Sequence, residues 1–469
     1  MNQEKSGYNA IIDGVIWKQL LIFFFPILLG SFFQQMYNTV DTIIVGQFAG
    51  KLALASVGST SSFVNLLFGF FVGLASGATV ILAQSVGAKD QQGVHDAVHT
   101  GIAMSVLGGL AITVLGLILS EPMMRLVRVA DDIWDGSLTY LRIFFLGMIP
   151  AVVYNVGAGI LRALGDSKRP LYFLIAGCLI NVVTDLIFVA LFDMGVAGAA
   201  IATVLSEVIS AVMVVVCLMR RQDASRLILK EIRIVPSVLR RILHIGVPGG
   251  LQSVMYNISN IIIQSSVNKL GSDTTAAWTA TGRADGIIWL IMGAFGTAIT
   301  TFVGQNFGAQ RYDRMRKSTR ICMAMAVGST LAVSAVLVIF ARPILSIFSD
   351  DQAVLDIGVE IFYAICPFYI TYVAVEILSG TIRGTGDTVK PVIFIALCTC
   401  LFRVIWVSVC DRLDMGLTAV SLAYGSSWLL TSCVFIVYYF RNRWLERRIQ
   451  VMGFKPEIRK KRHLFSKTA

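Results

Sequence analysis

Long apolar stretches separated by short polar connections make up nearly the whole chain. A bilayer core requires about 20 mostly apolar residues per helix. Stretches of that length occupy residues 17–45, 52–82, 94–119, 136–162, 168–191 and 195–219 in the first half. The second half repeats the pattern at residues 240–268, 274–305, 318–341, 357–383, 390–411 and 416–440. The pattern predicts an all-α integral membrane protein with twelve transmembrane helices.

Three short motifs recur after 221 residues. The segment that begins at Arg162 (RALGDSKRP) returns at Arg383 (RGTGDTVKP), and QSVGA at Gln84 returns as QNFGA at Gln305. Asp-Met-Gly follows the same offset, at 193–195 and 414–416. The chain is therefore expected to form two pseudo-symmetric six-helix bundles as a parallel repeat. A duplicated membrane chain is typical of transporters, because two similar halves can rock about a central site.

The repeat and the polar segments predict five regions. They are a cytoplasmic N-terminus (1–16), a first bundle (17–219), a basic cytoplasmic linker (220–241), a second bundle (240–440) and a basic cytoplasmic tail (441–469).

The composition agrees with a membrane protein. Hydrophobic residues make up 56% and charged residues 14%, against about 45–50% and 25% in soluble domains. Of the 39 lysines and arginines, 30 lie at the termini, with Lys18 counted at the first, and in connections 86–95, 162–170, 220–241, 306–320 and 383–391. The positive-inside rule places both termini in the cytoplasm. This distribution of basic residues accounts for the net charge of +11, so the charge does not indicate a nucleic-acid partner. The tail residues Arg459 to Arg462 either contact anionic lipid head groups or remain solvated.

The cysteines and histidines suggest little chemistry. The eight cysteines fall in or near predicted helices, where they are expected to be small buried apolar residues. His95 and His99 stand four residues apart at the start of a helix, but the sequence offers no third ligand for a metal. No histidine lies in the middle of a span, since His95, His99 and His244 fall near the ends of theirs. We therefore expect no serine–histidine–acid set at membrane depth.

Polar side chains at membrane depth are costly and therefore indicate function. The first predicted helix carries Gln34, Tyr37, Asn38 and Asp41 on one face. Further polar groups lie on the fourth, fifth and sixth helices of the first half: Asn155, Asn181, Asp185, Thr203 and Glu207. Such oxygen ligands suit a proton or a hard cation such as sodium. The alternative is that they only hydrogen-bond neighbouring helices, at about 0.6 kcal/mol each.

The repeat helps to weigh these alternatives. Asn181 corresponds to Phe402, Asp185 to Trp406 and Thr203 to Tyr424, while Asn155 corresponds to Glu376 and Asp41 roughly to Asn260. If the fold alone required the polar groups, the second half should have kept them. We therefore favour binding of a coupling ion over packing for Asp41 and Asp185, and leave both roles open for Thr203 and Asn155.

Two carboxylates in one cavity also suit a proton mechanism. Burial and like charge both favour the protonated form of one of them. Pro26 lies within the first helix, where it removes a backbone hydrogen bond and permits a kink. We hypothesise that the charge state of Asp41 and Asp185 sets the bend of this helix and so expels a bound compound.

The second half carries a different polar set. Tyr256 and Asn260 lie on one stripe of the seventh helix, and Tyr372 and Glu376 share a face of the tenth. Arg283 and Arg403 are interpreted as members of structural ion pairs. Gly69, Gly73 and Gly77 form a doubled GxxxG pattern on the second helix, which indicates close helix contact.

With Pro26, YNTVD (37–41), QSVGA (84–88), RALGDSKRP (162–170) and Asn181-x-x-x-Asp185, the chain resembles the multidrug and toxic compound extrusion (MATE) family, nearest its DinF-like branch. The resemblance covers about residues 12–440. It implies a V-shaped pair of bundles in a bacterial-type plasma membrane, exporting cationic or amphiphilic compounds in exchange for inward H⁺ or Na⁺.

The resemblance also implies residue roles. Asp41, Asn155, Asn181, Asp185 and Thr203 would form the cation-coupling site. We expect a substrate cavity made of Gln34, Tyr37, Asn38, Tyr256, Asn260, Tyr372 and Glu376. We expect no cofactor and no metal beyond a coupling Na⁺, and a monomer whose partners are small molecules and membrane lipids. A second ion site near Glu376 stays open.

Other functions compete with export by antiport. A channel would not need two inequivalent halves, whereas uptake of one dedicated nutrient or metabolite stays open. A lipid-linked saccharide flippase of the same superfamily would need a strongly basic cavity, and only Arg283 and Arg403 are candidates for one. A membrane-embedded enzyme would need an intramembrane nucleophile and base, which the sequence does not offer. Spacing alone identifies neither the cargo nor the coupling ion.

Overall fold

The computed structural model describes residues 10–127, 129–441 and 443–455. Tail residues 459–462, for which lipid contact is one of the two alternatives, lie outside the described residues. The first bundle contains α2 (Ile16–Ile44), α3 (Gly50–Gly87), α4 (Gln91–Val127), α5 (Trp134–Leu146), α6 (Met148–Ala163), α7 (Lys168–Asp185) and α8 (Gly195–Met219). Three π-helical turns interrupt the helices, η1 (Val45–Ala49), η3 (Leu186–Leu191) and η6 (Ala396–Leu401).

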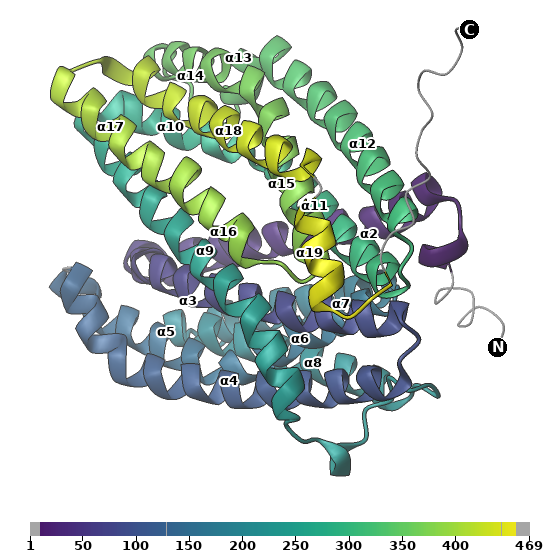
Figure 1. Cartoon of the computed structure of the whole chain (residues 1–469). Coiled ribbons are helices and arrows are strands. Elements are labelled where there is room, and N and C mark those ends of the chain that lie inside the picture. Colours follow the sequence, from purple (N-terminus) through teal and green to yellow (C-terminus); the bar gives the residue numbers. More distant parts are fainter. Residues whose placement is uncertain (1–9, 128, 442, 456–469) are drawn as a thin grey trace, which may run out of the picture.

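The second bundle repeats this order. It contains α9 (Pro236–Lys269), α10 (Ser272–Ala284), α11 (Gly286–Gly308), α12 (Tyr312–Ile339), α13 (Ala341–Leu345), α14 (Gln352–Ile365), α15 (Tyr369–Gly384), α16 (Val389–Ile395), α17 (Phe402–Leu413) and α18 (Gly416–Phe440). Figure 1 shows the two bundles. Helix α3 of the first bundle packs against α9 of the second at the boundary between them. A short helix, α19 (Arg443–Val451), follows α18.

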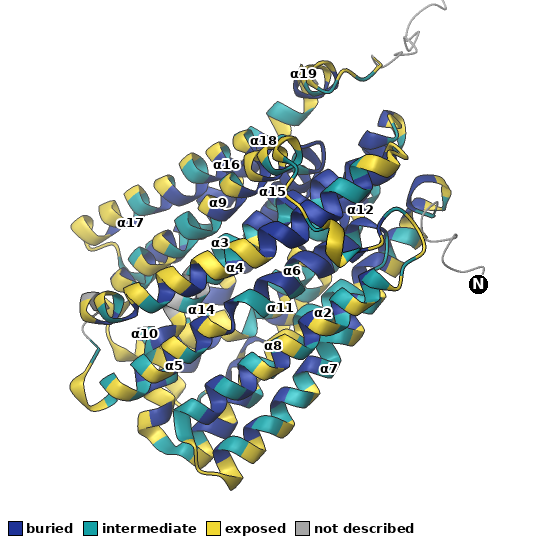
Figure 2. Ribbon diagram, turned by 90° about the horizontal axis from the view of Figure 1, so that it is seen from below, coloured by how far each residue is buried: buried dark blue, intermediate teal, exposed yellow. Residues whose placement is uncertain are grey.

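Within the described residues, ten helices are long and apolar enough to cross a membrane, and the bent pair α5–α6 makes an eleventh span. The remaining long helix, α9, carries Arg240, Arg241 and His244 near its start and is not among these spans. With α9 the count is the twelve that the sequence predicts. Exposed positions follow the outer faces of the helices (Figure 2), and they include large apolar side chains such as Leu115, Ile118 and Ile339. A lipid-facing surface accounts for this exposure.

Backbone conformation confirms the repeat. Residues with positive φ occur in pairs 221 positions apart, which shows that equivalent helices end in the same way. Three of the pairs are Lys89 with Gln310 (both 56°), Asp193 with Asp414 (both 51°) and Gly165 with Gly386 (92° and 87°). Because a left-handed residue with a side chain is uncommon, its recurrence at equivalent helix ends reflects one duplicated unit.

The first helix of each bundle crosses to the other bundle. The early residues Leu20, Phe23 and Phe24 of α2 belong to the hydrophobic core of the second bundle. Phe24 stacks on Phe295 of α11 with ring centroids 4.0 Å apart. In the same way, Ile242 and Ile245 near the start of α9 belong to the core of the first bundle. This exchange joins the two bundles at one end of the molecule.

The glycine pattern on α3 has the predicted meaning of a close helix contact, and its partner is α9. A Cβ atom on Gly73 would lie 2.4 Å from the backbone nitrogen of Gly250. A Cβ atom on Gly77 would lie 2.4 Å from the carbonyl oxygen of Ile242. The backbones of α3 and α9 therefore touch across the boundary between the bundles, which only glycine permits.

The same end is closed by two symmetric hydrogen bonds. Gln84 Nε2 donates to the carbonyl oxygen of Gly384 at 2.9 Å, and Gln305 Nε2 donates to the carbonyl oxygen of Ala163 at 2.7 Å. Both donors and both acceptors are related by the 221-residue offset. Both glutamines are buried. The recurring QSVGA and QNFGA motifs thus fasten each bundle to the other, and we call this contact the closed end.

Segments near both termini cover the closed end. Arg314 Nη2 donates to the carbonyl oxygen of Ile11 at 3.0 Å. The backbone nitrogen of Lys455 donates to Gln310 at 3.2 Å. On α19, Arg448 Nε donates to the carbonyl oxygen of Thr385 at 2.7 Å. The described segments near residues 11 and 455 therefore pack where the bundles meet, and the opposite ends of the bundles diverge (Figure 1).

Candidate functional site

Asp41 and Asp185 form a buried acidic pair in the first bundle. Asp41 lies in the last turn of α2 and Asp185 is the last residue of α7, so a π-helical turn follows soon after each. Such turns are frequent at functional sites. The packing of α2 on α7 brings the two carboxyl groups together, with only 8% of Asp41 and 0% of Asp185 exposed.

The two carboxyl groups are close enough to share a hydrogen bond. Neither oxygen of Asp185 receives a hydrogen bond from a donor within the described residues, and neither does Oδ1 of Asp41. Two ionised carboxylates have no proton to share, so the contact becomes a hydrogen bond only when one of them is protonated. Burying such acceptors without a donor is costly, and either a proton or a cation would remove that cost.

Asn181 belongs to the same region. It lies one helical turn before Asp185 on the same face of α7 and is fully buried. Its Oδ1 and Nδ2 atoms have no hydrogen-bond partner in the part of the chain that the structure describes. Asn181 thus adds an amide oxygen to the two carboxylates, which makes an oxygen-rich site suited to a hard cation or a proton.

Tyr37 joins this acidic site rather than a separate cavity. Its side chain lies near Thr203 of α8 and near both Asp41 and Glu207. Tyr140 of α5 is near all three acids, Asp41, Asp185 and Glu207. Glu207 was among the polar groups noted at membrane depth but not among the residues of the predicted coupling site, although it follows Thr203 by one helical turn. Tyr140 was not predicted at all, because nothing in the sequence singles it out.

Asn155 lies in a different cavity. Its Nδ2 atom donates to the carbonyl oxygen of Ala151 on its own helix at 2.8 Å. It lines a cavity of about 340 Å³ together with Pro26, Gln34 and Arg162. This cavity lies between α2, α6 and α7, and Leu290 of α11 reaches it from the second bundle. The helix α2 continues through Pro26 without a break. Of the other polar residues on α2, Asn38 is exposed.

An aromatic cavity of about 430 Å³ lies inside the second bundle. Among the predicted residues, Tyr256, Asn260 and Tyr372 line it. Three tryptophans, two charged residues and one further tyrosine complete most of its wall: Trp278, Trp289, Trp428, Asp285, Arg403 and Tyr424. The Tyr256 and Tyr372 hydroxyl groups are 3.5 Å apart. We refer to this space as the aromatic cavity.

Glu376 does not line the aromatic cavity. Its Oε1 atom is 3.6 Å from Nη2 of Arg383, and a Cβ atom on Gly296 would lie 2.0 Å from it. Glu376 therefore packs against α11 and pairs with the arginine of the second RGTGD motif. Arg403 makes no ion pair with Glu376 or Asp285 within the described residues, contrary to its interpretation as part of a structural ion pair.

His95, His99 and Glu231 lie close together, but their hydrogen bonds explain the cluster. His99 Nδ1 donates to the carbonyl oxygen of His95 at 2.8 Å, and His99 Nε2 accepts from the backbone nitrogen of Ile228 at 3.1 Å. Both ring nitrogens of His99 are thus engaged, so no lone pair remains for a metal. His95 contacts Glu231 at 2.9 Å. The two histidines hold the segment before α9 against α4.

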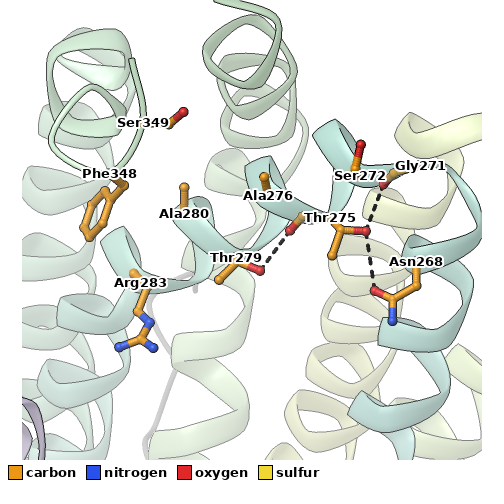
Figure 3. A pocket seen from close by; sticks show the side chains of 10 residues that line it. All are labelled: Asn268, Gly271, Ser272, Thr275, Ala276, Thr279, Ala280, Arg283, Phe348 and Ser349. Carbon is orange, nitrogen blue, oxygen red and sulfur yellow. Dashed lines mark hydrogen bonds between the residues drawn. The ribbon is translucent and has the colours of Figure 1, made fainter. Parts of the chain in front are cut away.

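A third depression lies at the turn between α9 and α10 (Figure 3). Thr275 Oγ1 donates to the carbonyl oxygen of Gly271 at 2.9 Å, and Thr279 Oγ1 donates to the carbonyl oxygen of Thr275 at 2.8 Å. Arg283 is the charged residue of its wall and is exposed. These groups satisfy one another locally, so the depression lacks the buried polar atoms of the other two sites.

Two similar bundles of membrane-spanning helices, one with a buried acidic site and the other with an aromatic cavity, define a multi-span membrane transporter. The MatE family model matches residues 26–187 and 248–408, one match in each half. The chain therefore belongs to the MatE (MATE) family. Members of this family are transporters, so the chain is not an enzyme.

Curated relatives and solved structures agree with this assignment. The chain is 28% identical over 433 residues to "Probable multidrug resistance protein YpnP" of Bacillus subtilis, covering 92% of this chain and 96% of the relative. "Probable multidrug resistance protein YoeA" of the same organism is 27% identical over 387 residues, 81% and 83% of the two chains. A crystal structure of MATE in the bent conformation superposes with a TM-score of 0.88 at 22% identity, covering 95% and 99%.

Proposed function

We propose that the protein exports cationic or amphiphilic organic compounds, drugs and toxins among them, in exchange for inward H⁺ or Na⁺. The observation that carries this proposal is the Asp41–Asp185 pair, which is buried and receives no hydrogen bond at either oxygen of Asp185 from the described residues. The names of the relatives supply the class of cargo.

The acidic pair would couple ion movement to conformation through its charge. A proton between the two carboxyl groups turns a repulsive contact into a hydrogen bond, and a sodium ion between them would have a similar effect. Either ion favours the arrangement of α2, α7 and α8 that keeps the acids together. Release of the ion restores the repulsion and favours another arrangement, which is how a gradient can do work on the bundles.

We also propose that the closed end faces the cytoplasm. In the sequence, most lysines and arginines lie in the termini and in connections such as 86–95, 306–320 and 383–391. These three connections adjoin the contacts that Gln84 and Gln305 make. With this orientation the diverging ends of the bundles open to the outside. The conformation is then the one from which cargo leaves and the coupling ion enters.

Gradient-driven transport tests the proposed function directly. In liposomes that contain the full-length protein, a pH gradient and a sodium gradient are imposed separately while ethidium movement is followed by fluorescence. We expect one of the gradients to drive ethidium transport above the level of protein-free liposomes, and that gradient identifies the ion. Equal ethidium movement with and without either gradient would refute ion-coupled export.

Pro26 is proposed as the hinge of α2. Residues before it, such as Phe23 and Phe24, pack into the core of the second bundle, whereas the acidic end of α2 packs against the first. Pro26 itself lines the cavity that contains Gln34 and Asn155. A bend at this point would therefore change the shape of that cavity while the start of α2 stays fixed.

Pro26→Ala restores the missing backbone hydrogen bond and should stiffen α2. We expect slower ethidium export with unchanged or higher thermal stability, because only the bent state loses population. Export is compared with wild type at matched protein levels, and Pro122→Ala serves as a control within another helix, α4. If Pro26→Ala exports as well as wild type, α2 does not work by bending at this residue.

A further inference from the structure

Arg403 brings a positive charge into the aromatic cavity, and no acidic side chain among the described residues forms an ion pair with it. Only 2% of this side chain is exposed. Its Nε atom donates to the Ser427 hydroxyl group at 2.8 Å. Its guanidinium carbon lies 4.2 Å from the ring centre of Tyr424 and 5.4 Å from that of Trp428. Stacking holds the guanidinium plane in place while its terminal nitrogens remain available to the cavity.

The one carboxylate that lines the aromatic cavity is engaged elsewhere. Asp285, at the break between α10 and α11, accepts a hydrogen bond from the Tyr369 hydroxyl group at 2.5 Å. The side chain of Trp289 also lies beside this carboxylate. Among the described residues no salt bridge joins Asp285 to Arg403. A buried guanidinium that lacks a counter-charge is costly unless an anion pairs with it.

The walls of the cavity suit a flat ring. Trp289 meets Tyr372 edge to face with ring centres 5.0 Å apart, and Trp428 with ring centres 5.6 Å apart. Trp278 and Tyr424 also line the cavity and contact each other, with ring centres 5.7 Å apart. A volume of about 430 Å³ is in the usual range for sites that bind small molecules. The cavity therefore offers aromatic surfaces beside one fixed cation.

The repeat shows how different the two bundles have become at this depth. Arg403 corresponds to Val182, Tyr424 to Thr203 and Trp428 to Glu207. Where the first bundle places a valine, a threonine and the acid Glu207, the second places an arginine and two aromatic rings. The ion site and the aromatic cavity thus have opposite preferences for charge.

We propose that the aromatic cavity binds planar aromatic compounds that carry an anionic group, zwitterions included, and that Arg403 pairs with that group. A carboxylate, sulfonate or phosphate accepts from the guanidinium, while the ring packs against Trp289 and its neighbours. The inference rests on the proposed function only in treating such compounds as cargo. It extends that function, because the cargo of one bundle would include anions.

Binding without any gradient tests the proposal. The full-length protein in phosphatidylcholine nanodiscs is titrated with 2-naphthoate, with neutral 2-naphthamide and with the cation 2-naphthylmethylammonium, and each Kd is measured by calorimetry. We expect 2-naphthoate to bind about ten- to a hundredfold more tightly than the amide, as a hydrogen bond to a buried charge provides. Arg403→Gln should remove this difference and leave amide binding within about twofold.

Arg283→Gln is the matched control, since Arg283 lies in the same bundle but lines the exposed depression of Figure 3. It should keep the preference for 2-naphthoate. Ser427→Ala removes only the hydroxyl group that holds Nε of Arg403, and it should weaken 2-naphthoate binding several-fold without changing amide binding. If Arg403→Gln fails to fold, Ser427→Ala tests whether Arg403 binds the anionic group.

Three results would overturn the proposal. One is equal binding of 2-naphthoate and 2-naphthamide by wild type, and another is tighter binding of the ammonium compound. The third is an unchanged preference for 2-naphthoate in Arg403→Gln or, if that variant does not fold, in Ser427→Ala. Because no gradient is imposed, loss of gradient-driven export in liposomes would refute the proposed function and leave this result intact.

Discussion

Asp41→Asn and Asp185→Asn are each expected to abolish gradient-driven export while leaving the protein folded. Asparagine has the shape of a protonated aspartate and cannot release a proton. The pair Asp41–Asp185 would then remain in the arrangement that the bound ion favours, and the gradient could no longer change it. Ethidium transport in liposomes should fall to the level without protein under both a pH and a sodium gradient.

The two variants should not be less stable than wild type. In the native site the buried oxygens of Asp185 have no donor among the described residues, so an amide that donates to the remaining carboxylate removes an unfavourable contact. The midpoint of thermal unfolding in detergent measures this. Asp132→Asn is the matched control, since Asp132 is exposed in the turn before α5, and it should transport like wild type.

If both aspartate variants transport like wild type, Asp41 and Asp185 serve only in helix packing. Loss in only one variant would instead indicate that a single carboxylate carries the ion and that the other tunes it. Both outcomes are read at matched amounts of reconstituted protein.

Gly308→Ala is expected to open the closed end and to slow export. A Cβ atom on Gly308 would lie 2.0 Å from the carbonyl oxygen of Gln84, and one on Gly87 would lie 1.9 Å from that of Gln305. Neither glycine has a positive φ, so alanine suits the local helix and the clash arises only between bundles. Overpacking of this kind costs about 1–3 kcal/mol, enough to change the ratio of two conformations about 5- to 150-fold.

Hydrogen–deuterium exchange of the full-length protein measures the opening. Peptides that contain residues 84–88 and 305–309 should exchange faster in Gly87→Ala and Gly308→Ala than in wild type, because the contact that includes Gln84 and Gln305 is weakened. Gly58→Ala is the control on α3, where nothing lies within 4 Å of the added carbon. If exchange and export in Gly308→Ala match those of Gly58→Ala, the closed end does not govern the transport cycle.

Much of the fold was predictable because it depends on local sequence. Helical spans follow from the length of apolar runs, and the duplication follows from motifs at a fixed offset, such as RALGDSKRP at Arg162. The contact along Gly73 and Gly77 followed from their spacing, although the sequence did not identify α9 as the partner. One span, α9, is polar enough near Arg240 and Arg241 that it was recognised through the repeat rather than through its own hydropathy.

The candidate site was predictable only in part. Asp41 and Asp185 stand out as acids at membrane depth, and the structure brings them together. Asn155, which is equally polar, lies instead in the cavity beside Pro26, since it packs there from α6. Tyr140 belongs to the acidic site but could not be found, because a tyrosine on an apolar helix face has no distinguishing pattern.

The sequence by itself determined the number of spans, the twofold repeat and the asymmetry of its polar groups, because each is a property of one segment or of two segments compared. Tertiary structure alone decided which polar groups meet. Three features depend on how helices far apart in sequence pack. They are the crossing of α2 and α9 into opposite bundles, the paired hydrogen bonds of Gln84 and Gln305, and the position of Arg403 beside Tyr424 without an ion pair among the described residues. Helical periodicity fixes the face on which a residue lies, whereas its neighbours come from helix packing.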